Sequence, residues 1–451
     1  MNTTIGVTQR LLHHHDLLAD SSVLNLFYAM GLDGPLDADA LRAAIALLPE
    51  FYPELGPAPV AEDDIFAFVD LSTHGLDETN DILARLIETE RRRPHDTHAG
   101  LLAHATLVRL DSTKHLLLLS FHHAVADGWS LALYAGHLSR AYAALRQGDA
   151  VPAPVQPRSK GVVRHDGRLE QERAALRMQL VGLTAAALDP FETSCDGEVT
   201  PRFWSRIVDA GFVDRLLTFA ADRRATPFSL FAAAVAQQLQ AMFGLTDVVL
   251  GTTVFGRRSS AEMAAGGAYY QGTLLPLRGP DFDLLTVNKA VAAAVDCHLS
   301  YEEQLAILSE VTQKMTPVEP SVFVLADSHP LSALRFPGIE VSVVVLSSQL
   351  SQNAKPAHSP SCGRVALFWR QGTNGASLTV FAEPGLVDAA RALHEKTLRR
   401  LGAWAGRAPK DEGAVSWHGP LVKPASPICE AVSPVSLPSR HDPFDRRPNV
   451  P

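Results

Sequence analysis

Residues 122–128, His-His-Ala-Val-Ala-Asp-Gly, hold the side chains of this sequence that are best suited to chemistry. They follow a leucine-rich apolar run, residues 115–121, which predicts a buried strand after a turn. Beyond them, apolar residues recur every three or four positions as far as Leu145, which predicts a helix that ends at Gly148. Polar side chains at the end of a buried strand face clefts, so we expect the catalytic site in this turn.

His123 and Asp127 in this turn each have two interpretations. His123 is either a general base, because neutral imidazole accepts a proton near pH 7, or a turn histidine that only hydrogen-bonds to the backbone. Asp127 is either the third member of a catalytic relay or a helix cap that pairs with an arginine. Gly128 fits a turn that needs a positive φ or a close approach of the backbone.

The elements that must position this turn form two halves. A chain of 451 residues exceeds one compact core, which predicts two domains. Proline-rich residues 150–160 indicate an extended connector, so we place an N-terminal lobe at residues 1–160 and a C-terminal lobe at 161–409. Residues 410–451 are rich in proline and serine with little periodicity, which predicts a poorly ordered tail.

The chain contains both strand and helix patterns, and we expect an α/β fold of the α+β sandwich type. The clearest helix start is Thr226-Pro227, a capping residue followed by proline in the first turn, and this helix ends at Gly244. One further helix is predicted to begin near Asp37 or Asp39. The other predicted helices cover residues 78–92, 169–187, 212–225, 285–299 and 386–403. The other predicted strands cover residues 23–32, 101–110, 203–208, 248–254, 271–278, 322–325, 339–346, 364–370 and 377–382.

Composition excludes several classes of function. The formal net charge of −9 argues against a nucleic-acid partner. No apolar run is long enough to span a membrane, and the first ten residues lack a signal-peptide core. No glycine-rich phosphate-binding motif occurs, so we expect no nucleotide cofactor.

Cysteine and histidine usage predicts no metal site. The four cysteines are far apart and form no CxxC pair, which indicates free thiols in a reducing cytoplasm. The run His13-His14-His15 has no carboxylate or cysteine cluster to complete a site, and consecutive histidines point in different directions.

Beyond the motif, the chain resembles the condensation-domain and CoA-dependent acyltransferase superfamily over about residues 8–405. Residues 122–128 match its HHxxxDG signature, and Gly128-Trp129-Ser130 resembles the usual continuation in condensation domains. Further similar segments occur in the order typical of the family, namely 226–228, 247–252, 256–257, 275–278 and 336–341. The DFGWG signature of the plant branch is absent, and residues 9–16 look like the start of stand-alone polyketide-associated (Pap-type) acyltransferases.

The resemblance implies two chloramphenicol-acetyltransferase-like lobes with a central channel. It implies that His123 is the catalytic base and that His122, Asp127 and Gly128 support the loop. It also implies an arginine partner for Asp127 from the second lobe, for which Arg257 is the candidate. Trp129 and Ser130 are assigned to the substrate channel, although an ordinary core aromatic explains Trp129 equally well.

We therefore expect a free-standing acyltransferase. It would move an acyl group from CoA or an acyl-carrier-protein thioester to a hydroxyl of a natural product or lipid. One alternative is a condensation enzyme that makes an amide from an amine acceptor in nonribosomal peptide-type biosynthesis, and another is an inactive homologue that binds carrier proteins. No cofactor and no metal are expected, and the enzyme would be a cytoplasmic monomer.

Overall fold

The computed structural model describes most of the chain. The described residues are 21–57, 59–97, 100–153, 166–191, 202–280, 282–313, 319–344, 364–372, 375–406 and 414–416. They all belong to one compact unit, Met1–His418. The histidine run 13–15, three of the four cysteines and most of the predicted tail lie outside the described residues.

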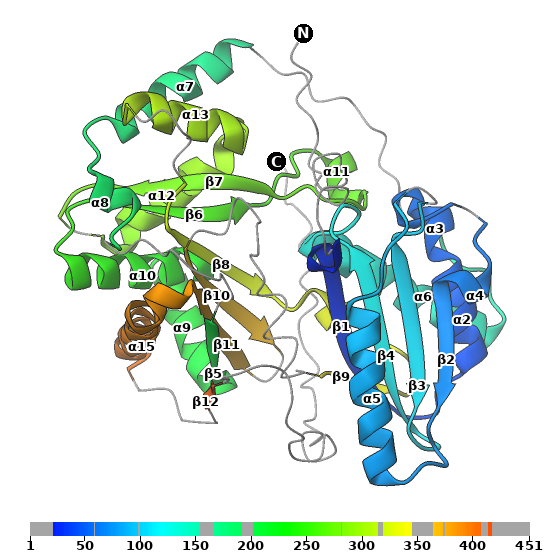
Figure 1. Ribbon diagram of the computed structural model, residues 1–451. Coiled ribbons are helices and arrows are strands. Elements are labelled where there is room, and N and C mark those ends of the chain that lie inside the picture. The colour runs from blue at the N-terminus through cyan, green and yellow to red at the C-terminus, as the bar shows by residue number, and fades with distance from the viewer. Residues whose placement is uncertain are drawn as a thin grey trace. The chain divides into compact units, whose positions relative to one another are not determined.

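Two β-sheets organise the described chain, as the α/β prediction requires (Figure 1). The five-stranded sheet has the order β2-β3-β4-β1-β9 and the seven-stranded sheet the order β12-β5-β11-β10-β8-β6-β7. The strands of the smaller sheet are β1 (Asn25–Asp33), β2 (Phe66–Asp70), β3 (Ala103–Arg109), β4 (Lys114–His122) and β9 (Glu340–Val343). Those of the larger sheet are β5 (Arg202–Asp209), β6 (Val248–Val254), β7 (Gln271–Leu277), β8 (Val322–Ser328), β10 (Val365–Gly372), β11 (Gly375–Ala382) and β12 (Ala414–Ser416).

The central strand of the smaller sheet, β4, leads directly to the motif. It pairs with β1 and β3, both antiparallel, and its pairing with β1 runs from Lys114 to His122. Helix α5 (Leu76–Arg91) covers one face of this sheet, and α2 (Ala38–Ala46), α4 (Glu62–Ile65) and α6 (Gly128–Gln147) lie on the other face (Figure 1). Because both faces are covered, β4 is a continuous apolar run rather than an alternating one.

The start of α2 and the end of α6 agree with the sequence prediction. Asp37 caps α2 by accepting a hydrogen bond from the Ala40 amide at 3.0 Å. Helix α6 ends at Gly148, which adopts a left-handed conformation with φ 71°. The remaining elements here are α3 (Leu48–Phe51), η1 (Ser21–Leu24) and η2 (Pro53–Leu55).

The larger sheet has its own apolar core. Helix α10 (Pro227–Phe243) is buried nearly all round, and Thr226 caps it by accepting from the Ser229 amide at 3.0 Å. The same core includes side chains from α9 (Ala210–Asp222), α12 (Leu284–Asp296), η4 (Pro384–Leu386) and α15 (Val387–Trp404). Against β6 and β7, a second cluster contains side chains of α13 (Tyr301–Val311).

The helix predicted over residues 169–187 is two helices. Helix α7 (Asp166–Leu180) ends before Gly182, which has a positive φ of 76°, and Thr184 caps the short α8 (Ala185–Leu188). Leu176 and Leu180 pack with residues of α13, so α7 belongs to the core of the second half.

A single boundary near residue 160 does not describe the structure fully. Strand β9 comes from the second half of the chain but pairs antiparallel with β1 at the edge of the smaller sheet. The preceding turn, η3 (Pro330–Ala333), packs on α6, and Leu331 and Leu334 join the apolar core of that sheet. Residues 330–343 are therefore part of the first lobe, although the sequence predicts them in the second.

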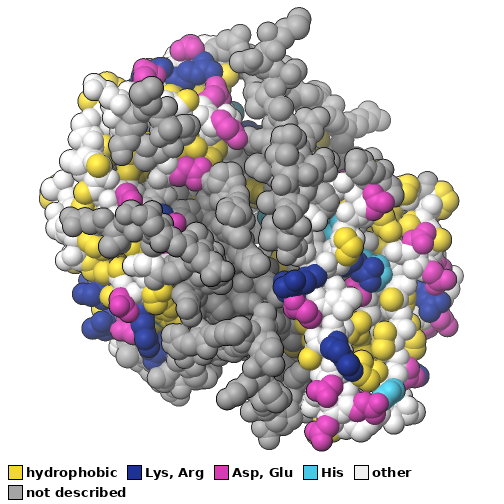
Figure 2. Space-filling model, viewed as in Figure 1, with side chains coloured by type: hydrophobic (Ala, Val, Ile, Leu, Met, Phe, Trp, Pro, Cys, Tyr) yellow, Lys and Arg dark blue, Asp and Glu magenta, His cyan; other side chains and the backbone are white. Residues whose placement is uncertain are grey.

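On the face that Figure 2 shows, acidic and basic side chains of the described residues are interspersed. No helix among the described residues is long and apolar enough to cross a membrane.

Candidate active site

The backbone fixes the start of the motif from two sides. The His122 amide donates to the carbonyl oxygen of Leu102 at 2.8 Å, and the His123 amide donates to that of Leu24 at 2.7 Å. The turn therefore leaves β4 held by segments on both flanks before it enters α6.

The hydrogen bonding of His123 fixes its tautomer. Its Nδ1 lies 2.9 Å from the carbonyl oxygen of Ala126. A carbonyl oxygen can only accept, so Nδ1 carries the proton and the Nε2 of the neutral ring carries the lone pair. The side chain is half-buried, and burial lowers its pKa below 6.5, partly offset by the bond to Ala126 and the charge of Asp127. At neutral pH the ring is therefore a neutral base.

Tyr270 lies beside His123, and the sequence did not single it out. The two ring centroids are 4.8 Å apart, with the ring planes inclined at 38°. Tyr270 immediately precedes β7, so the second half of the chain contributes an aromatic neighbour to the motif. The adjacent tyrosines 269 and 270 before a predicted strand were the available signal.

His122 points into the interior. It is fully buried, and its Nδ1 accepts a hydrogen bond from the Ala124 amide at 3.1 Å. Its ring lies 6.1 Å from that of His95, in an edge-on arrangement. This geometry suits support of the turn rather than contact with a substrate.

Asp127 is both a helix cap and one half of a buried ion pair. Its Oδ1 accepts from the Ser130 amide at 2.8 Å and lies 3.1 Å from Arg257 Nη2. Its Oδ2 accepts from the Tyr269 amide at 2.9 Å. The exposed fraction of the side chain is 8% for Asp127 and 0% for Arg257. The pairing that the resemblance implied is thus present in the structure.

Arg257 ties the segment that precedes β7 to the motif. Its guanidinium donates to the carbonyl oxygen of Gly267 at 3.2 Å and to that of Glu262, and its Nη2 lies 2.6 Å from Ser130 Oγ. It also lies over the ring of Tyr269, 4.1 Å from the centroid. We call residues 262–270 the clasp segment, because they contact the motif through side chains and backbone. It includes α11 only in part, since α11 spans Ser260–Ala264.

Ser130 and Trp129 both contact the clasp segment. Ser130 is fully buried, and its hydroxyl lies 2.6 Å from the Gly267 carbonyl oxygen and 2.9 Å from Asp127 Oδ1. It therefore belongs to the ion-pair network, in contrast to the channel position expected from the sequence. Trp129 is half-buried and donates its indole N–H to the Met263 carbonyl oxygen at 2.7 Å.

Gly128 differs from the expectation. It does not have a positive φ, and a Cβ at this position would meet no atom within 4 Å. Neither a strained turn nor close packing within the described chain requires glycine here. The residue is exposed at the first turn of α6.

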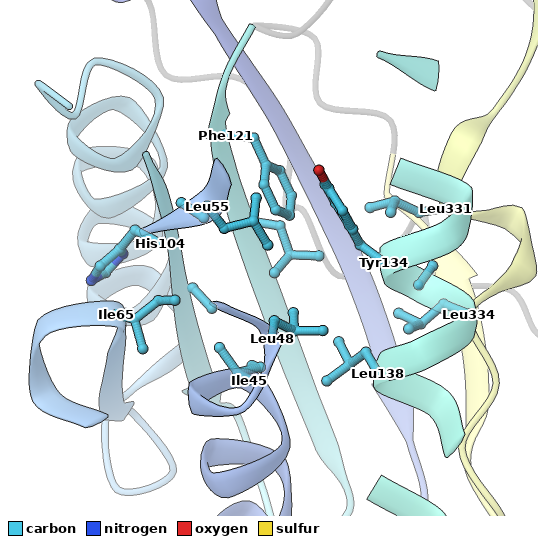
Figure 3. A pocket seen from close by; sticks show the side chains of 14 residues that line it. Ile45, Leu48, Leu55, Ile65, His104, Phe121, Tyr134, Leu138, Leu331 and Leu334 are labelled. Atoms are coloured by element: carbon cyan, nitrogen blue, oxygen red, sulfur yellow. The ribbon is translucent and has the colours of Figure 1, made fainter. Parts of the chain in front are cut away.

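An apolar cavity lies in the core of the smaller sheet, and no residue of the motif lines it (Figure 3). Phe121 and Tyr134 line it on one side, and Leu331 and Leu334 from the η3 region line it on another. His104 and Tyr134 are its only polar lining residues, so no set of polar groups converges on it. Among the described residues, no group of three or more His, Cys, Asp or Glu side chains could hold a metal ion.

Comparisons with known proteins point to one family. Residues 61–270 match the family model described as "Condensation domain". An alignment over 243 residues, which covers 50% of this chain, is 27% identical to the nonribosomal peptide synthetase dtxS1 of Metarhizium robertsii. The alignment covers only 3% of that synthetase, and the next two curated relatives are covered over 2% and 8% of their lengths.

Solved condensation domains share the fold. The domain from the monacolin K polyketide synthase MokA superposes with a TM-score of 0.66 at 16% identity, over 90% of this chain and 98% of that one. The starter condensation domain of rhizomide synthetase superposes with a TM-score of 0.61 at 14% identity, over 90% and 94%. These similarities confirm the predicted two-lobed α/β fold. The match over residues 61–270 agrees with the resemblance to condensation domains that the sequence indicates.

Proposed function

We propose that this chain transfers an acyl group from a thioester to a nucleophile held beside His123, which acts as the general base. The single observation that carries the proposal is the bond from His123 Nδ1 to the Ala126 carbonyl oxygen, at 2.9 Å. This bond leaves the lone pair of the neutral ring on Nε2. The lowered pKa keeps Nε2 unprotonated at neutral pH.

The proposed reaction balances without a covalent enzyme intermediate. Nε2 takes a proton from the amine or hydroxyl while its nitrogen or oxygen bonds to the thioester carbonyl carbon. The tetrahedral intermediate then collapses, the carbon–sulfur bond breaks, and Nε2 returns the proton to the departing thiolate. The imidazole ends the cycle neutral, as it began.

The start of α6 suits the negative charge that develops on the carbonyl oxygen. Gly128 and Trp129 occupy the first turn of this 20-residue helix, where amide N–H groups lack intrahelical acceptors and the helix dipole is positive. We assign the stabilisation of the oxyanion to this turn. Asp127 occupies the N-cap and is neutralised by Arg257, so its charge opposes this effect less.

We propose an amine rather than a hydroxyl as the acceptor, although one matched relative is named as a cyclodepsipeptide synthetase. The matched curated proteins include nonribosomal peptide synthetases, and the rhizomide starter domain was solved in complex with C8-CoA and Leu-SNAC. We therefore infer amide formation from an acyl thioester carried by CoA or by a carrier protein. The thioester is a substrate, so no cofactor is assigned. The same chemistry on a natural-product or lipid hydroxyl gives an ester and is the competing outcome. We further infer a cytoplasmic, monomeric enzyme.

A paired-acceptor assay tests the proposal. The full chain is incubated with acyl-CoA or an acyl-SNAC thioester and an equimolar amine and alcohol, and the products are identified by mass spectrometry. We expect amide as the main product, with turnover reduced roughly 100-fold or more in His123→Ala, the usual contribution of a general base. Replacement of the exposed His74 by alanine is the matched control and should leave turnover unchanged.

Three results would contradict parts of this proposal. Acylation of the alcohol alone would replace amide formation by ester formation. Full turnover by His123→Ala would remove the assignment of the base. Binding of a carrier protein by a wild-type chain that turns over no thioester would favour the inactive, carrier-binding homologue.

A further inference from the structure

The hydroxyl of Tyr134, on α6, has three polar neighbours that no motif indicates. It lies 2.7 Å from the carbonyl oxygen of Val125 and 2.9 Å from Glu54 Oε1. It also accepts a hydrogen bond from the Gly267 amide at 3.2 Å. These neighbours come from the motif, from η2 and from the clasp segment, so Tyr134 joins three separate parts of the chain.

The number of protons around Tyr134 determines the direction of these bonds. A phenol has one proton to donate, and burial raises the pKa of Tyr134 well above 10, so the hydroxyl keeps that proton. The Glu54 carboxyl and the Val125 carbonyl oxygen both lie within hydrogen-bond distance of this hydroxyl. If Glu54 is ionised, both oxygens can only accept, and the single hydroxyl proton can serve only one of them. If Glu54 is protonated, it donates to Tyr134, and Tyr134 donates to Val125. The hydroxyl then makes one bond as donor and accepts two, which uses its full capacity.

The surroundings of Glu54 favour the protonated form. The side chain is half-buried, and a Cβ on Gly266 would lie only 1.6 Å from Glu54 Oε1, so the clasp segment rests directly on the carboxyl group. The titratable groups that face it are the phenols of Tyr52, Tyr134 and Tyr269 and the guanidinium of Arg257.

Of these groups, only Arg257 carries a charge at neutral pH, and Asp127 already pairs with it. Burial is the largest influence on Glu54 and raises its pKa above 4.5, against the opposing effects of hydrogen bonds and Arg257.

The hydrogen bond from Tyr134 to the Val125 carbonyl is linked to His123 by a single residue, Ala126. The Val125 carbonyl belongs to the peptide that precedes the Ala126 α-carbon, and the next carbonyl, that of Ala126, holds His123 Nδ1. Loss of the donor to Val125 would free this peptide to rotate. The orientation of the adjacent carbonyl, and with it the aim of Nε2, would then be less fixed.

We propose that Glu54 carries a proton in the folded protein and donates a hydrogen bond to the Tyr134 hydroxyl, which positions the Val125–Ala126 peptide and through it His123. Glu54 is thus a positioning residue. When Glu54 ionises at higher pH, the Tyr134 hydroxyl turns its hydrogen bond from the Val125 carbonyl oxygen to the Glu54 carboxylate, and the Val125 carbonyl loses its donor. The effect on turnover rests on the proposed function, whereas the proton on Glu54 does not.

Carboxyl NMR of the full chain tests the proton directly. Protein labelled with ¹³C at the glutamate side-chain carboxyl is titrated, and Glu54→Gln assigns the Glu54 resonance by its loss. Glu78→Gln, at an exposed position in the first turn of α5, is the matched control. We expect the Glu54 resonance to remain in its protonated position at neutral pH and to titrate at a higher pH than the Glu78 resonance.

The imidazole signals of His123 test the positioning effect without any turnover. In the wild type they should shift a second time as Glu54 ionises, and this shift should be absent in Glu54→Gln, whose amide donates without titrating. In the acyl-transfer assay, the turnover of the wild type should fall as Glu54 ionises at high pH. Glu54→Gln should keep wild-type turnover at neutral pH and should not show this fall. Tyr134→Phe should lower turnover roughly tenfold at every pH, the rate equivalent of one lost buried hydrogen bond.

The outcomes separate the two proposals. A Glu54 resonance that is ionised at neutral pH overturns the inference, as does a second His123 shift that persists in Glu54→Gln. A protonated Glu54 coupled to His123 supports the inference even if the wild type turns over no thioester, and that result would count against the proposed function alone.

Discussion

At the scale of single residues, the buried charge pair Asp127–Arg257 governs the motif. The Arg257 side chain has no exposed surface, and its Nη2 contacts both carboxylate oxygens of Asp127, at 3.1 and 3.3 Å. Burial of two charges is costly, so such a pair adds little net stability, but removal of one partner leaves the other charge buried alone. The pair therefore makes the joint between motif and clasp segment sensitive to single substitutions.

Asp127→Ala should lower the free energy of unfolding by about 3–5 kcal/mol, the usual consequence of an unpaired buried charge. Asp127→Asn should cost less, because the amide oxygen can still accept from the Ser130 N–H at the N-cap. Urea unfolding of both variants measures the difference. The exposed pair of Asp70 with Arg109 provides the control, and Asp70→Ala should have a much smaller effect. Equal midpoints for Asp127→Ala and the wild type would contradict the prediction.

The sequence indicated some of these contacts but not others. The ordered resemblance placed Arg257 opposite Asp127, because both residues lie in matching segments. It gave no indication that Ser130 joins the pair or that Tyr134 and Glu54 brace the loop. Tyr134 fitted the apolar stripe of its helix, and the bond of its hydroxyl depends on where Val125 and Gly267 fold, which no local pattern encodes.

At the scale of elements, α6 holds the motif on one side and the core on the other. His137 lies on its buried face, fully inside, with its ring centroid 4.5 Å from that of Phe51 and 5.7 Å from that of Tyr52. Among the described residues neither ring nitrogen has a hydrogen-bond partner. This histidine therefore acts as an aromatic core residue that carries a titratable group.

His137→Phe should make the protein less sensitive to acid. Burial, aided by the positive charge of Arg140, lowers the pKa of His137 from 6.5 to about 4. The unfolded chain therefore binds this proton first as the pH falls below 6.5, and the folded state loses about 2 kcal/mol at pH 5. The phenylalanine variant lacks this loss and should be at least as stable as the wild type at pH 7, since no bonded polar group is removed.

Urea unfolding at pH 7 and pH 5 measures the effect. The drop in unfolding free energy between these values should be smaller in His137→Phe by about 2 kcal/mol. His74→Phe, at an exposed position, is the control and should retain the wild-type drop. An unchanged drop in His137→Phe would show that this histidine is protonated inside the fold.

Local signals predicted element ends well where caps were strong. Thr226, Pro227 and Gly244 define α10 as expected, because cap geometry is set by neighbouring residues alone. The break between α7 and α8 was missed, although Gly182 and Thr184 are a stop followed by a start. The apolar pattern continues across them, and periodicity alone does not register such a break.

At the scale of the whole described chain, residues 330–343 connect the second half to the first sheet. Strand β9 has only four residues and a half-exposed pattern, so its sequence favours a strand without indicating which sheet it joins. Its pairing with β1 depends on long-range contacts. Leu331 and Leu334 pack in the core of the smaller sheet, and the backbone of residues 338–339 lies close to Gly34. For this reason the sequence placed it in the wrong lobe.

Gly34→Ala should weaken this connection selectively. Gly34 has φ 143°, and a Cβ there would lie 2.5 Å from the Gly338 carbonyl oxygen and 3.0 Å from the Ile339 α-carbon, both backbone atoms. Strain of this kind costs about 1–3 kcal/mol, and it falls on the turn that leads into β9. We therefore expect a lower free energy of unfolding and faster amide hydrogen exchange in residues 338–344, ahead of the rest of the smaller sheet.

Gly128→Ala is the matched control, because a Cβ there meets no atom within 4 Å and its φ is not positive. Its stability should equal or slightly exceed that of the wild type, because alanine favours the helical conformation that Gly128 already has. Its exchange in β9 should equal that of the wild type, so that any change in turnover reports on the space above the first turn of α6. Hydrogen exchange followed by mass spectrometry distinguishes the two variants. If Gly34→Ala exchanges uniformly faster across both sheets, β9 unfolds only with the whole molecule and is not a separable connection.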